Sequence, residues 1–174
     1  MSVGKPFLLD ANVFIQAHKS YYGFDICPGF WLALLRQHEA KRLYSIDKIK
    51  AELLAQDDAL SKWAKNATTG TFFKQTTDKD VADAFRDLMK WVQSEGFPDQ
   101  AKSAFADAAD GWLVAYAKVN GLILVTHEAY KPDAKNRVLI PNLCVEFDVD
   151  WCNTFEMLRT LKVRFGLKKR KPKS

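Results

Sequence analysis

Two short runs of the chain are apolar at every position. Residues 7–9 are Phe-Leu-Leu, and residues 122–125 are Leu-Ile-Leu-Val. Because neither run has a polar face, each predicts a strand that is covered on both sides, as in the parallel sheets of α/β proteins. A further short strand is expected at residues 43–46, and weaker patterns predict strands at residues 71–73 and 142–147.

Segments between these strands have apolar residues at helical spacing. The segment that begins at Thr77 has the clearest apolar stripe, and Thr77 with Asp80 is spaced nearly as a capping box. The segment from Asp110 to the Asn120-Gly121 cap is nearly all apolar, which predicts a buried helix. The expected helices cover residues 12–20, 30–42, 47–56, a stretch around Trp63, and residues 77–95, 110–120 and 154–165. Strands that alternate with helices predict an α/β fold with a central, mainly parallel sheet.

Carboxylates follow both apolar runs. Asp10 comes directly after the first run, and Glu128 comes three residues after the second. The carboxyl ends of parallel strands meet at one edge of a sheet, where helix N-termini converge and ligands bind. A carboxylate buried there must be solvated, hydrogen-bonded or bound to a cation. Asp10 can instead be the N-cap of the next helix, and Asp110 can be favoured by its helix dipole, so both structural alternatives stay open.

Length and composition favour one folded domain. The chain has 174 residues, of which 48% are hydrophobic, enough for a sizeable core. It contains no apolar stretch of the roughly 20 residues that span a bilayer, and its N-terminus lacks the pattern of a signal peptide. We therefore expect a cytoplasmic protein without a membrane segment. Cys27, Cys144 and Cys152 have no Cys-x-x-Cys spacing and are expected to be reduced thiols rather than ligands of a zinc ribbon.

The positive charge of the chain is concentrated at its C-terminus. Five of the 26 Lys and Arg residues lie in the last seven positions, and the remaining 21 balance the 21 acidic residues. We therefore divide the chain into a neutral body, residues 1–166, and a basic tail, residues 167–174. Such a tail is suited to weak, salt-dependent binding of a nucleic-acid backbone, although a solvated end without a partner has the same composition. The basic side chains nearest the body are Lys168, Lys169, Arg170 and Lys171.

Several segments resemble the motifs of PIN domains, metal-dependent ribonucleases that are common among bacterial and archaeal toxins. Residues 8–15, Leu-Leu-Asp-Ala-Asn-Val-Phe-Ile, resemble the first motif, and residues 49–53, Ile-Lys-Ala-Glu-Leu, are similar to the second. Residues 109–117, Ala-Asp-Gly-Trp-Leu-Val-Ala-Tyr-Ala, followed by a glycine and a strand that ends in Val-Thr-His-Glu, resemble the third and fourth. The aromatic segment 21–31 resembles a stretch of one poorly characterised branch of the family. The resemblance covers roughly residues 5–160.

This resemblance implies a three-layer α/β/α PIN-like fold and a site of four acids. The catalytic acids of the motifs, which would also hold Mg²⁺ or Mn²⁺, correspond to Asp10, Glu52, Asp110 and Glu128. Converging carboxylates raise one another's pKa values unless a divalent cation occupies the site, and carboxylate oxygens suit these hard ions. The cation would activate water for attack on a phosphodiester.

Further polar residues accompany the four acids. The resemblance implies that Asn12 and Thr126 orient the acids or the waters around the metal. Asp107, one helical turn before the third acid, is a candidate additional acid, although a surface or capping role is the alternative. Two positions depart from the family pattern. Glu128 stands where many members have Asp, and Gly111 stands early in a helix, where it is about 1 kcal/mol less favourable than Ala.

The function implied by the resemblance is hydrolysis of RNA by a metal-dependent endoribonuclease that acts as the toxin of a type II toxin–antitoxin pair. Its implied partners are RNA, a cognate antitoxin protein and a second copy of the chain, because PIN domains often form dimers. Two alternatives stay open. One is a catalytically degenerate PIN-fold protein that binds RNA or regulates without turnover. The other is a phosphatase of the haloacid dehalogenase type, which normally needs a second Asp at the position of Asn12.

Overall fold

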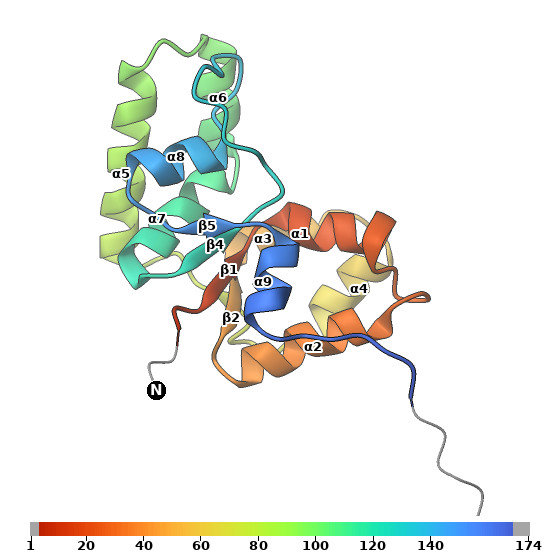
Figure 1. Ribbon diagram of the computed structural model, residues 1–174. Coiled ribbons are helices and arrows are strands. Elements are labelled where there is room, and N and C mark those ends of the chain that lie inside the picture. The colour runs from red at the N-terminus through yellow and green to blue at the C-terminus, as the bar shows by residue number, and fades with distance from the viewer. Residues whose placement is uncertain (1–3, 169–174) are drawn as a thin grey trace, which may run out of the picture.

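The computed structural model describes residues 4–168 of the chain. Within these residues the strands form one five-stranded sheet in the order β3-β2-β1-β4-β5, and every neighbouring pair is parallel. The strands are β1 (Phe7–Leu9), β2 (Leu43–Ile46), β3 (Phe73–Lys74), β4 (Ile123–Val125) and β5 (Trp151–Cys152). The expected α/β fold with a mainly parallel sheet is therefore confirmed (Figure 1).

Strand β1 lies at the centre of the sheet, which explains its unbroken apolar sequence. Phe7 pairs with Leu43 of β2 on one side and with Ile123 of β4 on the other. The three β1 side chains are at most 2% exposed. The two apolar runs are thus neighbouring strands, and their carboxyl ends meet at the same edge of the sheet.

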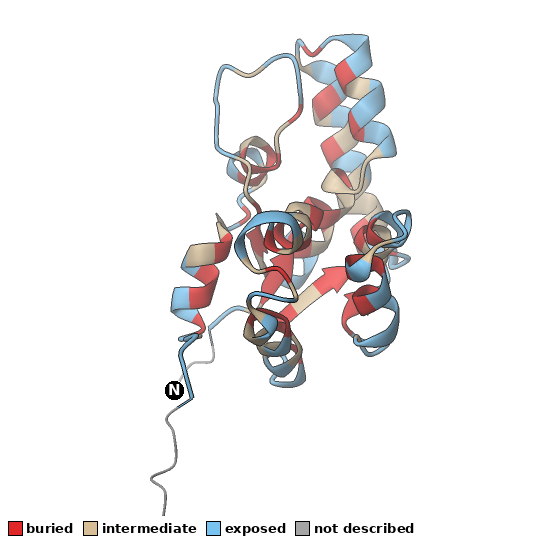
Figure 2. Cartoon of the chain, turned by 90° about the vertical axis from the view of Figure 1, so that its right-hand side faces the viewer, coloured by how far each residue is buried: buried red, intermediate tan, exposed pale blue. Residues whose placement is uncertain are grey.

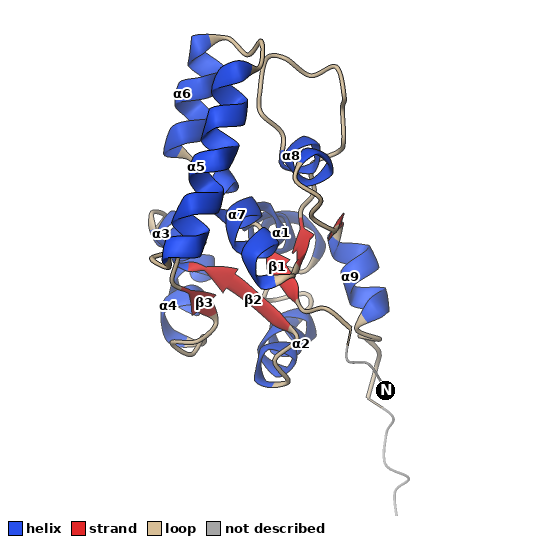
Figure 3. Ribbon diagram, turned by 90° about the vertical axis from the view of Figure 1, so that its left-hand side faces the viewer, coloured by secondary structure: helices blue, strands red, loops and turns tan. Residues whose placement is uncertain are grey.

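Helices cover both faces of the sheet, which gives the three layers expected from the sequence. Figure 1 places α5, α6, α7 and α8 on one side of the sheet and α1, α2, α4 and α9 on the other, and Figure 3 shows α5 and α6 side by side, reaching beyond the sheet. The helices are α1 (Ala11–Gln16), which continues as a π-helix, η1 (Ala17–Tyr21), then α2 (Pro28–Glu39), α3 (Asp47–Leu54), α4 (Ala59–Asn66), α5 (Lys79–Ser94), α6 (Asp99–Asp107), α7 (Asp110–Asn120), α8 (Ile140–Glu146) and α9 (Thr154–Thr160).

Helix α7 is packed into the core, as its nearly all-apolar sequence predicts. Leu113, Val114 and Ala117 are at most 1% exposed. The helix ends at Gly121, which has the left-handed φ of 64° that glycine adopts without a steric penalty. This cap turns the chain directly into β4, so the start of α7 and the end of β4 lie near the same edge of the sheet.

The prediction of a strand at residues 142–147 is wrong. Ile140–Glu146 form α8, and the last strand is β5, further along the chain. The in–out alternation that favoured a strand is absent in the structure, since Leu143 and Cys144 are both buried and Val145 is 56% exposed. The start of α8 depends on Glu128, whose carboxylate accepts a hydrogen bond from the first N–H of the helix. No local sequence pattern predicts this contact between Glu128 and Ile140.

Several helix boundaries also differ from the prediction. Helix α5 begins at Lys79, and its cap is Asp78 rather than Thr77, because the Asp78 carboxylate accepts a hydrogen bond from the N–H of Asp80. Helix α2 begins at Pro28, which suits the first helical position. Helix α6 has no counterpart among the expected helices, and α9 ends before the expected boundary. These differences move element ends without changing the order of strands and helices.

Burial follows the layers of the fold. In Figure 2 the strands and the sheet-facing sides of the helices are buried, whereas the outer helix faces are exposed. None of the helices within residues 4–168 has both the length and the apolar character needed to cross a membrane. All three cysteines are free thiols, as expected.

Candidate active site

Asp10 lies at the carboxyl end of β1 and is 3% exposed. It occupies the N-cap position of α1, but its side chain makes no capping hydrogen bond. Instead, its Oδ2 atom accepts a hydrogen bond from Thr126 Oγ1 at 2.9 Å. Thr126 directly follows the neighbouring strand β4, so the side chain of Asp10 is fixed by the sheet edge. A helix-capping role alone therefore does not account for this buried carboxylate.

Ionisation of Asp10 is unfavourable in the fold. Burial raises its pKa from the ordinary 3.8 to about 7, and the negative charge of Asp110 contributes to the rise. The hydrogen bond from Thr126 opposes the rise, and the charge of Glu128 adds to it. Asp10 is therefore close enough to two of the other predicted acids to be perturbed by them.

Asp110 shows the same behaviour at the first position of α7. Burial and then the charge of Glu128 raise its pKa to about 6, whereas the positive charge of Arg137 lowers it. Glu52 raises the pKa of Asp110 further, so Glu52 also lies near the other acids. Each of the four acids predicted from the sequence therefore lies close enough to at least one other to affect a pKa.

Three of the four acids, Asp10, Glu52 and Asp110, face one open cleft of about 810 Å³ at the carboxyl edge of the sheet, which we call the acidic cleft. Its walls come from the start of α1, from α3, and from the junction between α6 and α7. Glu52, on α3, is the exposed member, and partial burial raises its pKa. The charged, polar and aromatic side chains that line the cleft are Asp10, Asn12, Lys48, Glu52, Asp107, Asp110, Trp112 and Arg137.

Glu128 is not among the residues that line the cleft. Its side chain is 8% exposed and forms an ion pair with Arg137, whose side chain is 59% exposed. The second carboxylate oxygen accepts a hydrogen bond from the N–H of Ile140 at 2.7 Å. Both oxygens of Glu128 are therefore engaged by the protein, although the charge still acts on Asp10 and Asp110.

The remaining predicted residues have mixed positions. Asn12 and Asp107 line the cleft, but Asp107 is the last residue of α6 and is separated from α7 by a break at residues 108–109. It therefore reaches the cleft from a different helix than expected. Lys168 lies elsewhere, in a groove between α2 and the C-terminal segment. Lys169, Arg170 and Lys171 lie outside the described residues.

Comparison with protein families places this architecture in one family. The model described as a domain of unknown function, DUF4411, matches residues 7–165, a span that contains every strand and helix described above. The chain belongs to this family. No curated protein matches the chain. Because the DUF4411 description names no activity, the chemistry of the site rests on its residues.

Gly111 has a steric role beside the acidic cleft. A Cβ atom at this position would lie 2.8 Å from Cζ of Phe105 and 2.9 Å from Cε2 of Phe85. Phe85 in turn stacks on Trp112, with ring centroids 3.9 Å apart, and Nζ of Lys48 lies 4.6 Å from the Trp112 centroid. Gly111 therefore allows these aromatic side chains to pack closely, which explains a glycine early in the helix.

The oxygen ligands available in the acidic cleft fit a hard divalent cation. Asp10, Glu52 and Asp110 offer carboxylate oxygens, and the lining contains no His or Cys, which softer metals prefer. Burial first, and then the charges of neighbouring acids, raise the pKa values of Asp10 and Asp110, and a bound cation would lower them. Within residues 4–168, however, no group of three or more His, Cys, Asp or Glu side chains has the spacing of a ready-made metal site. Binding would therefore require the carboxylates to draw closer together.

The sequence did not predict three residues that line the acidic cleft, namely Lys48, Trp112 and Arg137. Lys48 lies four positions before Glu52 on α3, so helical spacing is the signal that places it on the same face. Trp112 is hidden within the apolar pattern of α7. Arg137 lies in an irregular loop between β4 and α8, where no periodicity reports on side-chain position.

Proposed function

We propose that this chain is a Mg²⁺- or Mn²⁺-dependent endoribonuclease that hydrolyses RNA phosphodiester bonds at the acidic cleft. The observation that carries the proposal is the single cleft shared by Asp10, Glu52 and Asp110, two of which have pKa values of about 7 and about 6. Placing acids with raised pKa values close together opposes folding, and such groups are typical of functional sites. The resemblance of several segments to PIN motifs supports the same chemistry.

The residues of the cleft have distinct roles in this proposal. Asp10, Glu52 and Asp110 would hold the cation, and the hydroxyl of Thr126 fixes the Asp10 carboxylate in position. The chemistry that the cation supplies is activation of a water molecule and neutralisation of charge on the phosphate. Lys48 places a positive charge beside the acids, where it attracts the RNA backbone. Asn12 supplies an amide that hydrogen-bonds water in the cleft.

Cleavage of a mixed RNA by purified protein tests the proposal. The reactions contain Mn²⁺, Mg²⁺ or EDTA, and each is repeated with Asp10→Asn and with the control Asp57→Asn, which changes an exposed acid outside the cleft. Cleavage should require metal, fall by about 100-fold or more in Asp10→Asn, and persist in Asp57→Asn. Wild-type protein that cleaves no RNA in either metal would contradict the nuclease.

One observation favours the alternative of a degenerate PIN-fold protein. Glu128, the fourth acid of the expected set, has both carboxylate oxygens engaged by Arg137 and by the N–H of Ile140. A site with an incomplete ligand set would bind RNA without cleaving it. RNA binding by wild type and Asp10→Asn alike, without cleavage in either metal, would favour this function. The phosphatase alternative lacks comparable support, because Asn12 offers no second carboxylate.

The biological setting is a proposal that rests on the resemblance alone. We propose that the nuclease acts in the cytoplasm as the toxin of a type II toxin–antitoxin pair, bound by a cognate antitoxin protein, and that it forms homodimers. Induced expression should then arrest growth, and the Asp10→Asn substitution should relieve the arrest. Normal growth with active enzyme present would argue against the toxin role, and light scattering of the purified protein tests for the dimer.

A further inference from the structure

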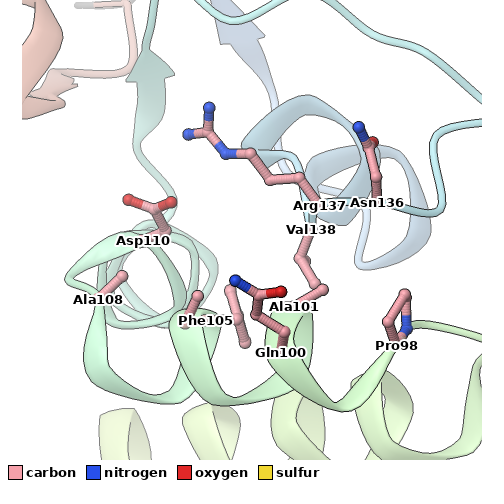
Figure 4. Close-up of a pocket in the computed structure, with 10 residues that line it drawn as sticks. Pro98, Gln100, Ala101, Phe105, Ala108, Asp110, Asn136, Arg137 and Val138 are labelled. Atoms are coloured by element: carbon pink, nitrogen blue, oxygen red, sulfur yellow. The ribbon is translucent and has the colours of Figure 1, made fainter.

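A second cavity adjoins the acidic cleft. It measures about 520 Å³, within the range of sites for small organic ligands, and it shares Asp110 and Arg137 with the cleft. Figure 4 shows the amide of Gln100, from α6, and the amide of Asn136, from the loop before α8, on facing walls of the cavity. The rest of the lining is mostly apolar. A ligand in this cavity would therefore meet hydrogen-bonding groups at its edges and apolar atoms against its faces.

The loop that carries Asn136 and Arg137 is anchored to the helices around it. The backbone N–H of Lys131 donates to the Asn142 side chain at 3.1 Å, and the Asn142 amide donates back to the Lys131 carbonyl at 2.7 Å. Nζ of Lys135 lies 5.4 Å from the ring centroid of Phe97, which follows α5. These contacts hold the loop against α8 and against the α5–α6 pair. The loop therefore presents its side chains from a fixed position.

Arg137 is held where the two cavities meet. Its guanidinium pairs with the buried carboxylate of Glu128, which is itself fixed by the N–H of Ile140. A guanidinium has more N–H donors than one carboxylate oxygen accepts, and its planar fork suits a phosphate. Figure 4 shows this guanidinium and the Asp110 carboxylate at the same end of the cavity. A phosphate bound by Arg137 would thus lie beside the proposed catalytic acids.

Resting on the proposed nuclease function, we propose that Arg137 binds a phosphate of the substrate strand beside the cleaved bond, and that the adjoining cavity receives the neighbouring base. Gln100 and Asn136 read the edge of that base, because amides both donate and accept hydrogen bonds. A base inside a duplex is stacked and paired, so only an unpaired base can enter such a cavity. Glu128 is then a positioning residue that acts through Arg137, rather than a ligand of the cation.

Binding of labelled RNA in the absence of cleavage tests this inference. The full-length Asp10→Asn protein is titrated into fluorescein-labelled oligoadenylate, oligocytidylate and oligouridylate, with anisotropy measured from about 50 to about 300 mM KCl. The Asp10→Asn protein is then compared with two double variants, which carry in addition either Arg137→Gln or the matched control Arg86→Gln. Arg86 is also exposed and also paired with an aspartate, but lies on α5. Thermal denaturation of each variant confirms that it is folded.

Arg137→Gln should weaken binding of all three RNAs alike, by about tenfold at the lowest salt, because a phosphate contact carries no sequence information. It should also reduce the slope of log affinity against log salt by about 0.7, the value for one phosphate contact on a single strand. Arg137→Lys keeps the charge but not the planar fork, so it should restore the slope and only part of the affinity. Equal affinities and slopes for Arg137→Gln and Arg86→Gln would overturn the phosphate contact.

The base-binding cavity has its own readout. The double variant Gln100→Ala, Asn136→Ala should change the affinity ratios among the three RNAs by about fivefold and leave the salt slope unchanged, whereas the control Gln93→Ala should change neither. Unchanged ratios would overturn the cavity. None of these measurements needs cleavage, so they separate the two ideas. An inactive wild type with the expected binding pattern contradicts only the nuclease, and an active wild type with unaltered variants contradicts only this inference.

The role of Glu128 is tested by calorimetric titration of Mn²⁺ into the otherwise wild-type protein. If Glu128 acts through Arg137, Glu128→Gln should keep Mn²⁺ affinity within about twofold and lower RNA affinity in the same direction as Arg137→Gln. A loss of Mn²⁺ affinity of about tenfold or more would make Glu128 a metal ligand and overturn the positioning role.

Discussion

Replacing Asp10 by Asn should stabilise the metal-free protein at neutral and alkaline pH. The pKa of this carboxyl is about 7 in the fold against the ordinary 3.8, first because of burial and then because of the charge of Asp110. The folded state therefore binds this proton more tightly than the unfolded state does. The resulting stability is fully present below about pH 4, falls as the pH rises, and is lost above about pH 7.

The size of the effect follows from proton linkage. Each pH unit between the two pKa values removes about 1.4 kcal/mol from the free energy of unfolding. Between pH 5 and pH 8 the wild type should lose up to about 3 kcal/mol relative to Asp10→Asn, and water entering the open cleft reduces this to a range of about 1–3 kcal/mol. The amide oxygen of Asn can still accept the hydrogen bond from Thr126, so the comparison isolates the charge.

Urea unfolding in EDTA, followed by circular dichroism at several pH values, measures the effect. Asp107→Asn is the control, because it removes a charge from the exposed rim of the same cleft and should change stability by no more than about 0.5 kcal/mol. Added Mn²⁺ should then stabilise the wild type by about 2.7 kcal/mol at 100 times its dissociation constant, and should stabilise Asp10→Asn by less. Parallel pH curves for wild type and Asp10→Asn in EDTA would refute the reasoning.

Three further substitutions test the walls of the cleft. Gly111→Ala should lower the free energy of unfolding by about 1–3 kcal/mol, because the clash with two phenylalanine rings outweighs the helix-propensity gain of about 1 kcal/mol. A thermal midpoint above that of wild type would contradict this packing argument. Thr126→Val should reduce the rate of RNA cleavage by about 10- to 100-fold by releasing the Asp10 carboxylate, and Thr126→Ser should recover most of the rate. Equal losses in both variants would assign the effect to packing. Lys48→Met should weaken RNA binding and flatten its salt dependence while keeping its packing on Trp112, and an unchanged affinity would exclude a phosphate contact at this position.

The centre of the sheet could be predicted from the sequence because burial on both faces leaves no freedom in residue type. The strands at Phe7–Leu9 and Ile123–Val125 are apolar throughout and pair with each other. The edge strands β3 and β5 have two residues each, which is too short for any periodic pattern. The misplaced strand at residues 142–147 shows the same limit, because its apparent alternation belongs to a helix whose first N–H is bound by a distant carboxylate.

The positions of the acids were predictable for a related reason. Asp10 follows a buried strand and Asp110 begins a buried helix, so the direction of the chain alone brings both to the carboxyl edge of the sheet. The contacts of Glu128 were not predictable in this way. They depend on a loop that returns nine residues later to bring Arg137 against the carboxylate, and no spacing rule relates those two positions.

Gly111 and Glu128, which differ from the PIN motifs that the surrounding segments resemble, concern one part of the structure. Gly111 makes room for Phe105, which lines the second cavity, beside Trp112, which lines the acidic cleft. Glu128 holds Arg137, which lines both. An aspartate at position 128 would be one methylene shorter, and its carboxylate would have to span the same two partners, the guanidinium and the first N–H of α8, from further away. Both departures therefore bear on the boundary between the cleft and its neighbouring cavity. If the proposed nuclease activity is correct, these two residues should influence which nucleotide the protein accepts beside the cleaved bond.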